Sequence, residues 1–289
     1  MRKEKDSIVK LAPAICCLPL CLLTYGCFEH REAPERLVSA TGMAEAFERR
    51  ETVQQVDLCG AELDQLPLEL AQMPRLQRLL LRGARVAGFE ALSGLSNLRM
   101  LDLSAMQLTA VPAALGGLGS LTQLYLADNG LTTLPEELAR LAALEYLNLD
   151  RNRLAALPDA LGSLANLRWI RLNQNELTSL PAGVGAWRQL QRLYARGNRL
   201  ETLPPALDQC ILIEDLALSH NRFVVFPEVL TRLPKLRNLD LAGNPLADLP
   251  VDAMARMEAL RLLTLTGCQV PEATQQRLRA ALPKCLITF

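Results

Sequence analysis

The sequence predicts an α/β solenoid, or horseshoe, in which about ten similar coils stack and their short strands form one parallel sheet on the concave face. Three observations support this fold class. When the chain is aligned with itself at an offset of 23 residues, apolar positions come into register over most of its length. Half of the residues are hydrophobic although only 4% are aromatic, so the apolar content is mainly leucine and alanine. Each repeat also alternates apolar and polar residues over a short stretch, which is typical of a strand with one buried face.

Ten repeat units follow from the apolar residue that leads each one. These residues are Val53, Leu76, Leu98, Leu121, Leu144, Leu167, Leu190, Ile213, Leu236 and Leu260. In the fifth unit, the stretch from Leu144 to Leu149 predicts a strand with Leu147 and Leu149 directed inward and Tyr146 and Asn148 directed outward. One coil cannot bury its leucines alone, so the stacked coils are expected to share a continuous core.

Two further positions recur after the strands. An asparagine whose amide can satisfy buried backbone groups of neighbouring coils stands at Asn129, Asn152, Asn175, Asn198, Asn221 and Asn244. A proline ends the next apolar step at Pro67, Pro112, Pro135, Pro158, Pro181, Pro204, Pro227 and Pro250, and a short helical or irregular return leg is expected to follow. The first three coils depart from the pattern, because Ala61, Ala84 and Met106 replace the asparagine. Trp187 and Cys210 stand where other return legs carry leucine, so we interpret them as core residues.

Both ends of the repeat array are predicted to be capped. The expected divisions are a signal segment with a lipobox (1–27), a linker and N-terminal capping helix (28–52), the repeats (53–267) and a C-terminal cap (268–289). A short helix is expected from Thr41 to Arg50, and Met43, Ala46 and Phe47 would cover the first coil. Such caps protect the apolar ends of a solenoid from water.

The C-terminal cap is expected to contain a helix over residues 271–282 and a strand over residues 286–289. Cys268 and Cys285 could form a disulfide across this cap if the protein is exported. The alternative is two separate buried thiols, because spacing in the sequence does not determine the distance between two cysteines.

The first 27 residues resemble an export signal. Four basic residues among the first ten precede a short apolar run that contains two prolines. The run ends at Leu23 to Cys27, which resembles a bacterial lipobox, and this resemblance implies lipidation of Cys27. Phe28 after the cysteine favours an outer-membrane lipoprotein of the bacterial cell envelope. The alternatives to lipidation are a plain signal or a signal anchor. A secreted or cytoplasmic protein would follow if the segment is cleaved conventionally or the start codon is misassigned.

The repeat units resemble the bacterial leucine-rich-repeat family, whose coils follow the pattern LxxLxLxxNxLxxLPxxLxxL. The resemblance covers about four fifths of the chain, and the cap sequences Ala44-Glu45-Ala46 and Leu282-Pro283-Lys284-Cys285 are similar to caps of that family. It implies the solenoid fold with high specificity. It also implies a binding function, since members of the family bind proteins, peptides or glycans and share no catalytic residues.

Aromatic and arginine side chains gather at the outward positions of the central strands. The predicted ligand-binding residues are Tyr125, Tyr146, Asn148, Asp150, Trp169, Arg171, Asn173, Arg192, Tyr194 and Arg196. Adjacent strands lie about 4.8 Å apart, so this patch would be about 15 to 20 Å wide. Aromatic and arginine residues supply much of the binding energy at interfaces, which favours a binding site. The alternative is cross-strand stacking that only stabilises the sheet.

A weaker polar cluster on the eighth and ninth coils contains Asp215, His220, Asn238 and Asp240. It could hold a cation, but no spaced ligand motif supports a metal site, and a solvated polar face is the favoured interpretation. No metal ion or other cofactor is therefore expected.

Charge and motif content argue against enzymes and nucleic-acid-binding proteins. Thirty-one basic residues balance thirty-one acidic ones without long runs of like charge, so no nucleic-acid partner is expected. The two histidines and the absence of common catalytic motifs argue against an enzyme. The favoured function is a monomeric binding module for a protein, peptide or glycan, which would meet the membrane only through its lipid anchor. A secreted or cytosolic interaction protein is the alternative, and an enzyme with an atypical site around Cys59 or Asp215 is a distant one.

Overall fold

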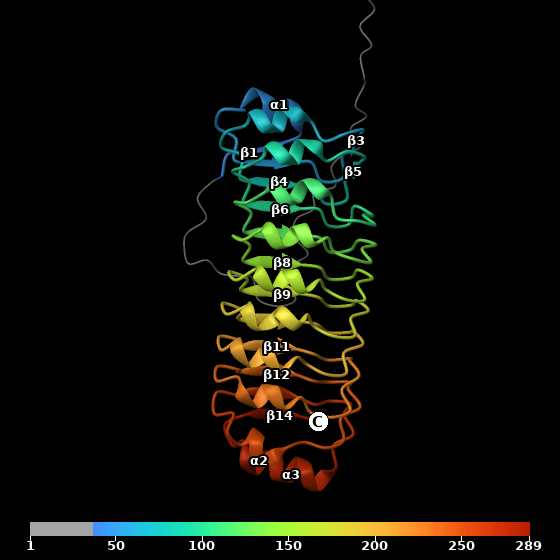
Figure 1. Ribbon diagram of the computed structural model, residues 1–289, viewed down its shortest axis with the longest axis vertical. Helices are drawn as coiled ribbons and strands as arrows, with labels where there is room; N and C mark the ends of the chain where they lie inside the picture. Colours follow the sequence, from blue (N-terminus) through green and yellow to red (C-terminus); the bar gives the residue numbers. More distant parts are fainter. Residues whose placement is uncertain (1–36) are drawn as a thin grey trace, which may run out of the picture. The chain divides into compact units, whose positions relative to one another are not determined.

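The computed structural model describes residues 37–289, in which short coils stack on one another along the chain (Figure 1). The predicted signal segment and its lipidation site Cys27 lie outside the described residues. Within residues 37–289, no helix has the length and apolar character needed to cross a membrane.

One long parallel sheet runs through the whole stack. Its twelve strands, in spatial order, are β1 (Ser39–Thr41), β2 (Gln55–Asp57), β4 (Arg78–Leu80), β6 (Met100–Asp102), β7 (Gln123–Tyr125), β8 (Tyr146–Asn148), β9 (Trp169–Arg171), β10 (Arg192–Tyr194), β11 (Asp215–Ala217), β12 (Asn238–Asp240), β13 (Leu262–Thr264) and β14 (Leu286–Thr288). Ten of these strands come from the ten predicted repeats, and β1 and β14 come from the two ends. The predicted α/β solenoid is therefore confirmed, and its strands pair in register, as Leu147 does with Ile170.

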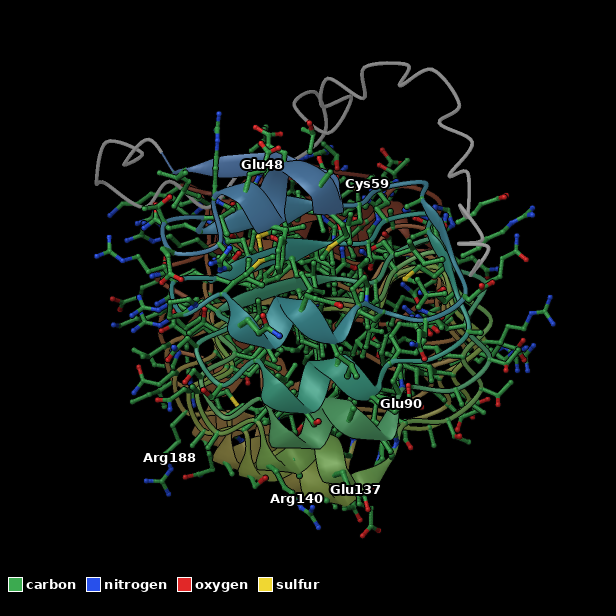
Figure 2. All side chains as sticks on the ribbon, turned by 90° about the horizontal axis from the view of Figure 1, so that it is seen from above. Glu48, Cys59, Glu90, Glu137, Arg140 and Arg188 are labelled. Atoms are coloured by element: carbon green, nitrogen blue, oxygen red, sulfur yellow. The ribbon has the colours of Figure 1, made fainter. Side chains whose placement is uncertain are left out.

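Short helical return legs close the coils on the other side of the core. Eight are 3₁₀ helices: η2 (Leu68–Gln72), η3 (Glu90–Gly94), η4 (Ala113–Gly117), η5 (Glu136–Arg140), η6 (Asp159–Ser163), η7 (Ala182–Ala186), η8 (Pro205–Gln209) and η9 (Glu228–Arg232). A ninth return leg is the short α-helix α2 (Val251–Met254). Seven of the 3₁₀ helices directly follow the predicted prolines. Seen from above, Glu137, Arg140 and Arg188 project outward from this helical side (Figure 2).

Leucines from the strands and return legs fill one continuous core between the two layers. Trp187 and Cys210 are both fully buried, which confirms their interpretation as core residues. Their polar atoms are satisfied by the neighbouring coil, because the Trp187 indole Nε1 donates to the Leu161 carbonyl at 2.8 Å and the Cys210 thiol to the Val184 carbonyl at 3.3 Å.

The six predicted asparagines form a ladder of hydrogen bonds between coils. Asn175 is typical: its Nδ2 donates to the carbonyls of Leu149 and Leu172 at 2.9 and 3.1 Å, and its Oδ1 accepts the N–H of Leu154 at 3.1 Å. Most of these asparagines are buried, so they replace the water that the backbone groups of the turn would otherwise bind. The ladder fixes the spacing of the coils from β7 to β12.

The residue before each ladder position has a left-handed backbone. Several coils place glycine there, such as Gly197 and Gly243, with φ of 64° in both. Others place a larger residue there, including Arg151 and Gln174, with φ of 55° and 56°. This backbone conformation favours glycine, so the larger side chains occupy it at some cost in conformational energy.

The first coils, which lack the asparagine, contain a second parallel pair of strands. β3 (Glu62–Leu63) pairs with β5 (Arg85–Val86), and Arg85 forms an ion pair with Glu62 at 3.3 Å. This pairing supplies backbone hydrogen bonds between coils at the edge of the turn. It was not predicted from the sequence.

The N-terminal cap differs in detail from the expectation. Helix α1 (Met43–Glu48) buries Ala46 and partly buries Met43 against the core, but Phe47 is 42% exposed and does not cover the first coil. Phe47 lies one position beyond the buried Ala46 on the helix, so it points to another side, where Arg50 approaches its ring at 5.1 Å. Strand β1, which was not predicted, pairs with β2 and covers that edge of the sheet.

At the C-terminus, helix α3 (Glu272–Ala281) buries Leu278, and β14 extends the sheet by one strand. Cys268 and Cys285 are free thiols, so the structure contains no disulfide between them. The Cys268 thiol donates to the Leu241 carbonyl at 3.3 Å, as a ladder residue would. Both thiols are partly rather than fully buried, and burial raises their pKa values.

Candidate functional site

The outer face of the sheet carries a continuous row of four aromatic rings, which we call the aromatic ladder: Tyr125, Tyr146, Trp169 and Tyr194. One ring comes from each of the strands β7 to β10. Successive ring centroids lie 4.9, 5.0 and 5.6 Å apart, and the last two pairs are edge-to-face, with interplanar angles of 78°. Such tilted contacts are the favourable geometry for aromatic pairs. The predicted patch residues on these strands are therefore brought together.

The rings of the aromatic ladder differ in how much surface they offer. Trp169 is only 5% exposed, so the expectation that it would be an open contact residue is wrong. Tyr146 and Tyr194 enclose it on both sides, and the guanidinium groups of Arg192 and Arg171 lie 5.1 and 6.0 Å from its ring centroid. The tyrosines are partly exposed. Burial also raises the pKa of the Tyr146 hydroxyl.

Asp150 is an internal anchor and not a surface contact. Its side chain is 2% exposed, accepts a hydrogen bond from Arg171 Nε at 2.7 Å, and also accepts the backbone N–H of Asn173 at 2.8 Å. Burial alone would lower the pKa of Arg171, but the charge and hydrogen bond of Asp150, together with the neighbouring Tyr146 and Tyr194, outweigh it and the pKa is raised. Asp150 therefore holds the Arg171 guanidinium charged and fixed beside the rings.

The other two arginines of the patch are also held by acidic residues. Arg192 forms an ion pair with Asp215 at 3.2 Å. Arg196 donates to the Ser219 hydroxyl at 2.7 Å and lies 3.6 Å from Asp240. The carboxylates of the cluster considered above for a cation therefore neutralise arginines of the patch. Sequence reasoning missed this link, although the strand register places Arg192 directly beside Asp215.

The asparagines of the patch shape the turn. Asn148 Oδ1 accepts the backbone N–H of Asp150 at 3.0 Å, and Asn173 Oδ1 accepts that of Arg196 at 2.9 Å. Asp128, which follows the strand β7, was not predicted to belong to the patch. Its Oδ2 accepts a hydrogen bond from Arg151 Nη2 at 2.6 Å. This hydrogen bond with Arg151 lowers the pKa of Asp128 despite its partial burial.

The result is a face on which four rings are in contact and the surrounding arginines are paired with carboxylates. It offers apolar ring surface with hydrogen-bond donors held around it, a combination common at recognition surfaces.

A comparison with family models places the chain in a known family. The model described as leucine rich repeat matches residues 74–131, 108–154, 142–200, 188–246 and 213–270, which together span more than half of the chain. The protein therefore belongs to the leucine-rich-repeat family. None of the curated proteins that were compared with it matches.

Several solved structures share the fold. The Toll–Spatzle complex of Drosophila is 20% identical with a TM-score of 0.69, the TLR13–ssRNA13 complex is 21% identical with a TM-score of 0.68, and the plant peptide hormone receptor RGFR1 in complex with RGF2 is 21% identical with a TM-score of 0.63. The matches cover 86%, 84% and 83% of this chain but only 39%, 36% and 44% of those chains. At this identity the likeness establishes the fold alone.

Proposed function

We propose that the protein is a non-enzymatic binding module whose sheet face, expected to be concave, recognises a protein, peptide or glycan. The observation that carries the proposal is the aromatic ladder. Among the described strands of the long sheet, only β7 to β10 place aromatic side chains on the outer face. Aromatic residues and arginine are the types that dominate binding energy at interfaces.

The fixed arginines add to this argument. A side chain that is already held before binding loses less conformational entropy when a ligand arrives. Asp150, Asp215 and Asp240 hold the three arginines around the rings, so the face is preorganised. The aromatic ladder is four strands wide and spans about 15 Å, which matches the length of about five residues of an extended peptide that crosses the strands.

Three of the structures with a similar fold are complexes with Spatzle, with ssRNA13 and with RGF2. They support a binding function for this chain without identifying its ligand. Of these ligand classes, we favour a protein or peptide for this chain because its positive and negative charges are equal and the arginines of the patch are neutralised by carboxylates.

Site-specific photo-crosslinking tests which face binds. A photoreactive amino acid replaces Gln123, beside Tyr125 on the sheet face, or Arg140, which projects from the helical side (Figure 2). Cells producing each variant are irradiated, and the products are identified by mass spectrometry for proteins and by glycan analysis. The proposal expects a reproducible crosslinked product from position 123 and none of the same product from position 140. Crosslinking from position 140 alone would overturn it.

We further propose that a lipid on Cys27 tethers the module to the bacterial cell envelope, in the outer membrane. The support is the lipobox-like stretch that ends at Cys27 and the Phe28 that follows it. Metabolic labelling with a palmitate analogue, in the wild type and in Cys27→Ala, tests this. Label that depends on Cys27 is the expected result. Soluble, unlabelled wild-type protein would contradict the tether and favour a secreted or cytosolic interaction protein.

A further inference from the structure

A polar pocket of about 390 Å³ lies away from the aromatic ladder, at the edge of the sheet where the strands begin. It is formed by the coils of β4, β6 and β7, near the N-terminal end of the stack (Figure 1). Its lining residues are Pro74, Arg75, Gln77, Asn97, Arg99, Ser120 and Thr122. Two of them are arginines and none is a carboxylate, so the lining carries positive charge.

Arg99 differs from the other arginines at the same position of the coil. Each of these residues stands immediately before its strand. Arg168 forms an ion pair with Glu145 at 3.5 Å, and Arg237 lies 3.8 Å from Glu214. Arg261 instead donates to the carbonyl of Glu258 at 2.7 Å.

The neighbours of Arg99 in this column are the neutral residues Gln77 and Thr122. The backbone N–H of Arg99 donates to the Gln77 carbonyl at 2.8 Å, and that of Thr122 to the Arg99 carbonyl at 2.9 Å, so the three residues stand side by side. Within residues 37–289, the Arg99 guanidinium donates no hydrogen bond to a carboxylate or a carbonyl. It also forms no ion pair with any of these residues. Its hydrogen-bond donors therefore face the pocket and solvent.

The walls of the pocket are held in place by side-chain bonds to the backbone. Asn97 Nδ2 donates to the Pro74 carbonyl at 3.0 Å, and the Thr122 hydroxyl donates to the Arg99 carbonyl at 3.0 Å. Each bond crosses from one coil to the next and so fixes lining residues relative to each other. Arg75, which also lines the pocket, has no ion pair among the described residues.

We propose that this pocket binds the phosphate or sulfate group of a small ligand, with Arg99 and Arg75 on its oxygen atoms. A guanidinium group presents paired N–H donors that match two oxygens of such a group. Gln77 and Ser120 add neutral donors at the sides. The volume falls in the range of small-molecule sites and exceeds what one oxyanion needs, so it leaves room for a polar remainder such as a sugar ring.

Isothermal titration calorimetry with the full chain at low salt tests the proposal. The probes are glucose 6-phosphate, glucose 6-sulfate and glucose. Binding of at least one of the esters and none of glucose is expected, and the affinity should fall as salt is added. The ratio of the two ester affinities identifies which oxyanion the pocket prefers.

The variants Arg99→Gln and Arg237→Gln form a matched pair, because they remove the same group at the same position of two coils. Loss of a charge-assisted hydrogen-bond pair in Arg99→Gln should weaken ester binding by about 10-fold or more, whereas Arg237→Gln should stay within about 2-fold of wild type. Circular dichroism verifies that both variants are folded. The proposal is overturned if neither ester binds the wild type, if glucose binds equally well, or if Arg99→Gln binds like Arg237→Gln.

Discussion

Replacing one residue of the asparagine ladder should lower the free energy of unfolding by an amount that follows from the hydrogen bonds it makes. In Asn175→Ala, the Leu154 N–H loses the acceptor Asn175 Oδ1 at 3.1 Å. The carbonyls of Leu149 and Leu172 each lose one bond but keep a second, from the ladder residue on the other side. A buried donor left without an acceptor costs about 1–3 kcal/mol, and each of the two bonds lost by the carbonyls adds about 0.5–1.5 kcal/mol, so the loss should be about 2–6 kcal/mol.

The assay is urea unfolding of the wild type and two variants, followed by circular dichroism. Asn166→Ala is the matched control, because Asn166 lies on an exposed loop and donates to the Ala142 carbonyl at 2.8 Å, where water can replace it. The control should lose less than about 1 kcal/mol. Equal losses in Asn175→Ala and Asn166→Ala, at unchanged dependence on urea, would refute the reasoning that buried ladder bonds hold the coils together.

Three further predictions concern single sites. In Gly243→Ala the new Cβ would lie 2.6 Å from His220 Nδ1. The free energy of unfolding, measured by thermal unfolding, should therefore fall by more than the roughly 1 kcal/mol that the left-handed backbone costs. Adding His220→Ala removes the clash and should recover the part of the loss beyond that cost. The lowered pKa of Asp128 means that its pair with Arg151 stabilises the fold above the ordinary value of 3.8 and stops doing so as the pH falls through the lowered value. Arg151→Gln should therefore lose under about 1 kcal/mol at neutral pH and progressively less as the pH falls below 3.8, and a loss that does not change with pH would contradict the assignment. Cys59 is exposed, but desolvation of its thiol together with the hydrogen bond and negative charge of Asp57 raises the pKa of the thiol to about 12. Iodoacetamide at pH 8 should therefore alkylate it at least about 100-fold more slowly than free cysteine, and alkylation at the free rate would exclude this environment.

The periodic part of the fold could be predicted from the sequence because every coil repeats the same physical task. Leucines at fixed spacing must point inward, and an asparagine with three hydrogen-bonding groups meets the backbone at the turn. This register predicted the ten strands of the repeats, the asparagine ladder and the burial of Trp187. Non-periodic features did not, because β1 and the β3–β5 pair have no recurring signal in the sequence.

The candidate site could be located from the sequence but not described in detail. The four rings stand on consecutive strands that pair in register, so their proximity was predictable. The burial of Trp169 was not, because it depends on the rotamers of the two tyrosines that enclose it. Asp150 was predicted to be a ligand contact because it follows directly after a strand of the patch, whereas in the structure its carboxylate is buried and pairs with Arg171.

The central claim is that the aromatic ladder is the binding surface. Its most direct test is the affinity of three purified variants for the ligand that photo-crosslinking identifies. Tyr125→Ala and Tyr194→Ala remove the partly exposed rings at the two ends of the ladder, and Arg140→Ala removes an exposed side chain of the helical side. We predict that each tyrosine variant binds at least about 10-fold more weakly than wild type while Arg140→Ala is unchanged. Wild-type affinity in both tyrosine variants would contradict the account.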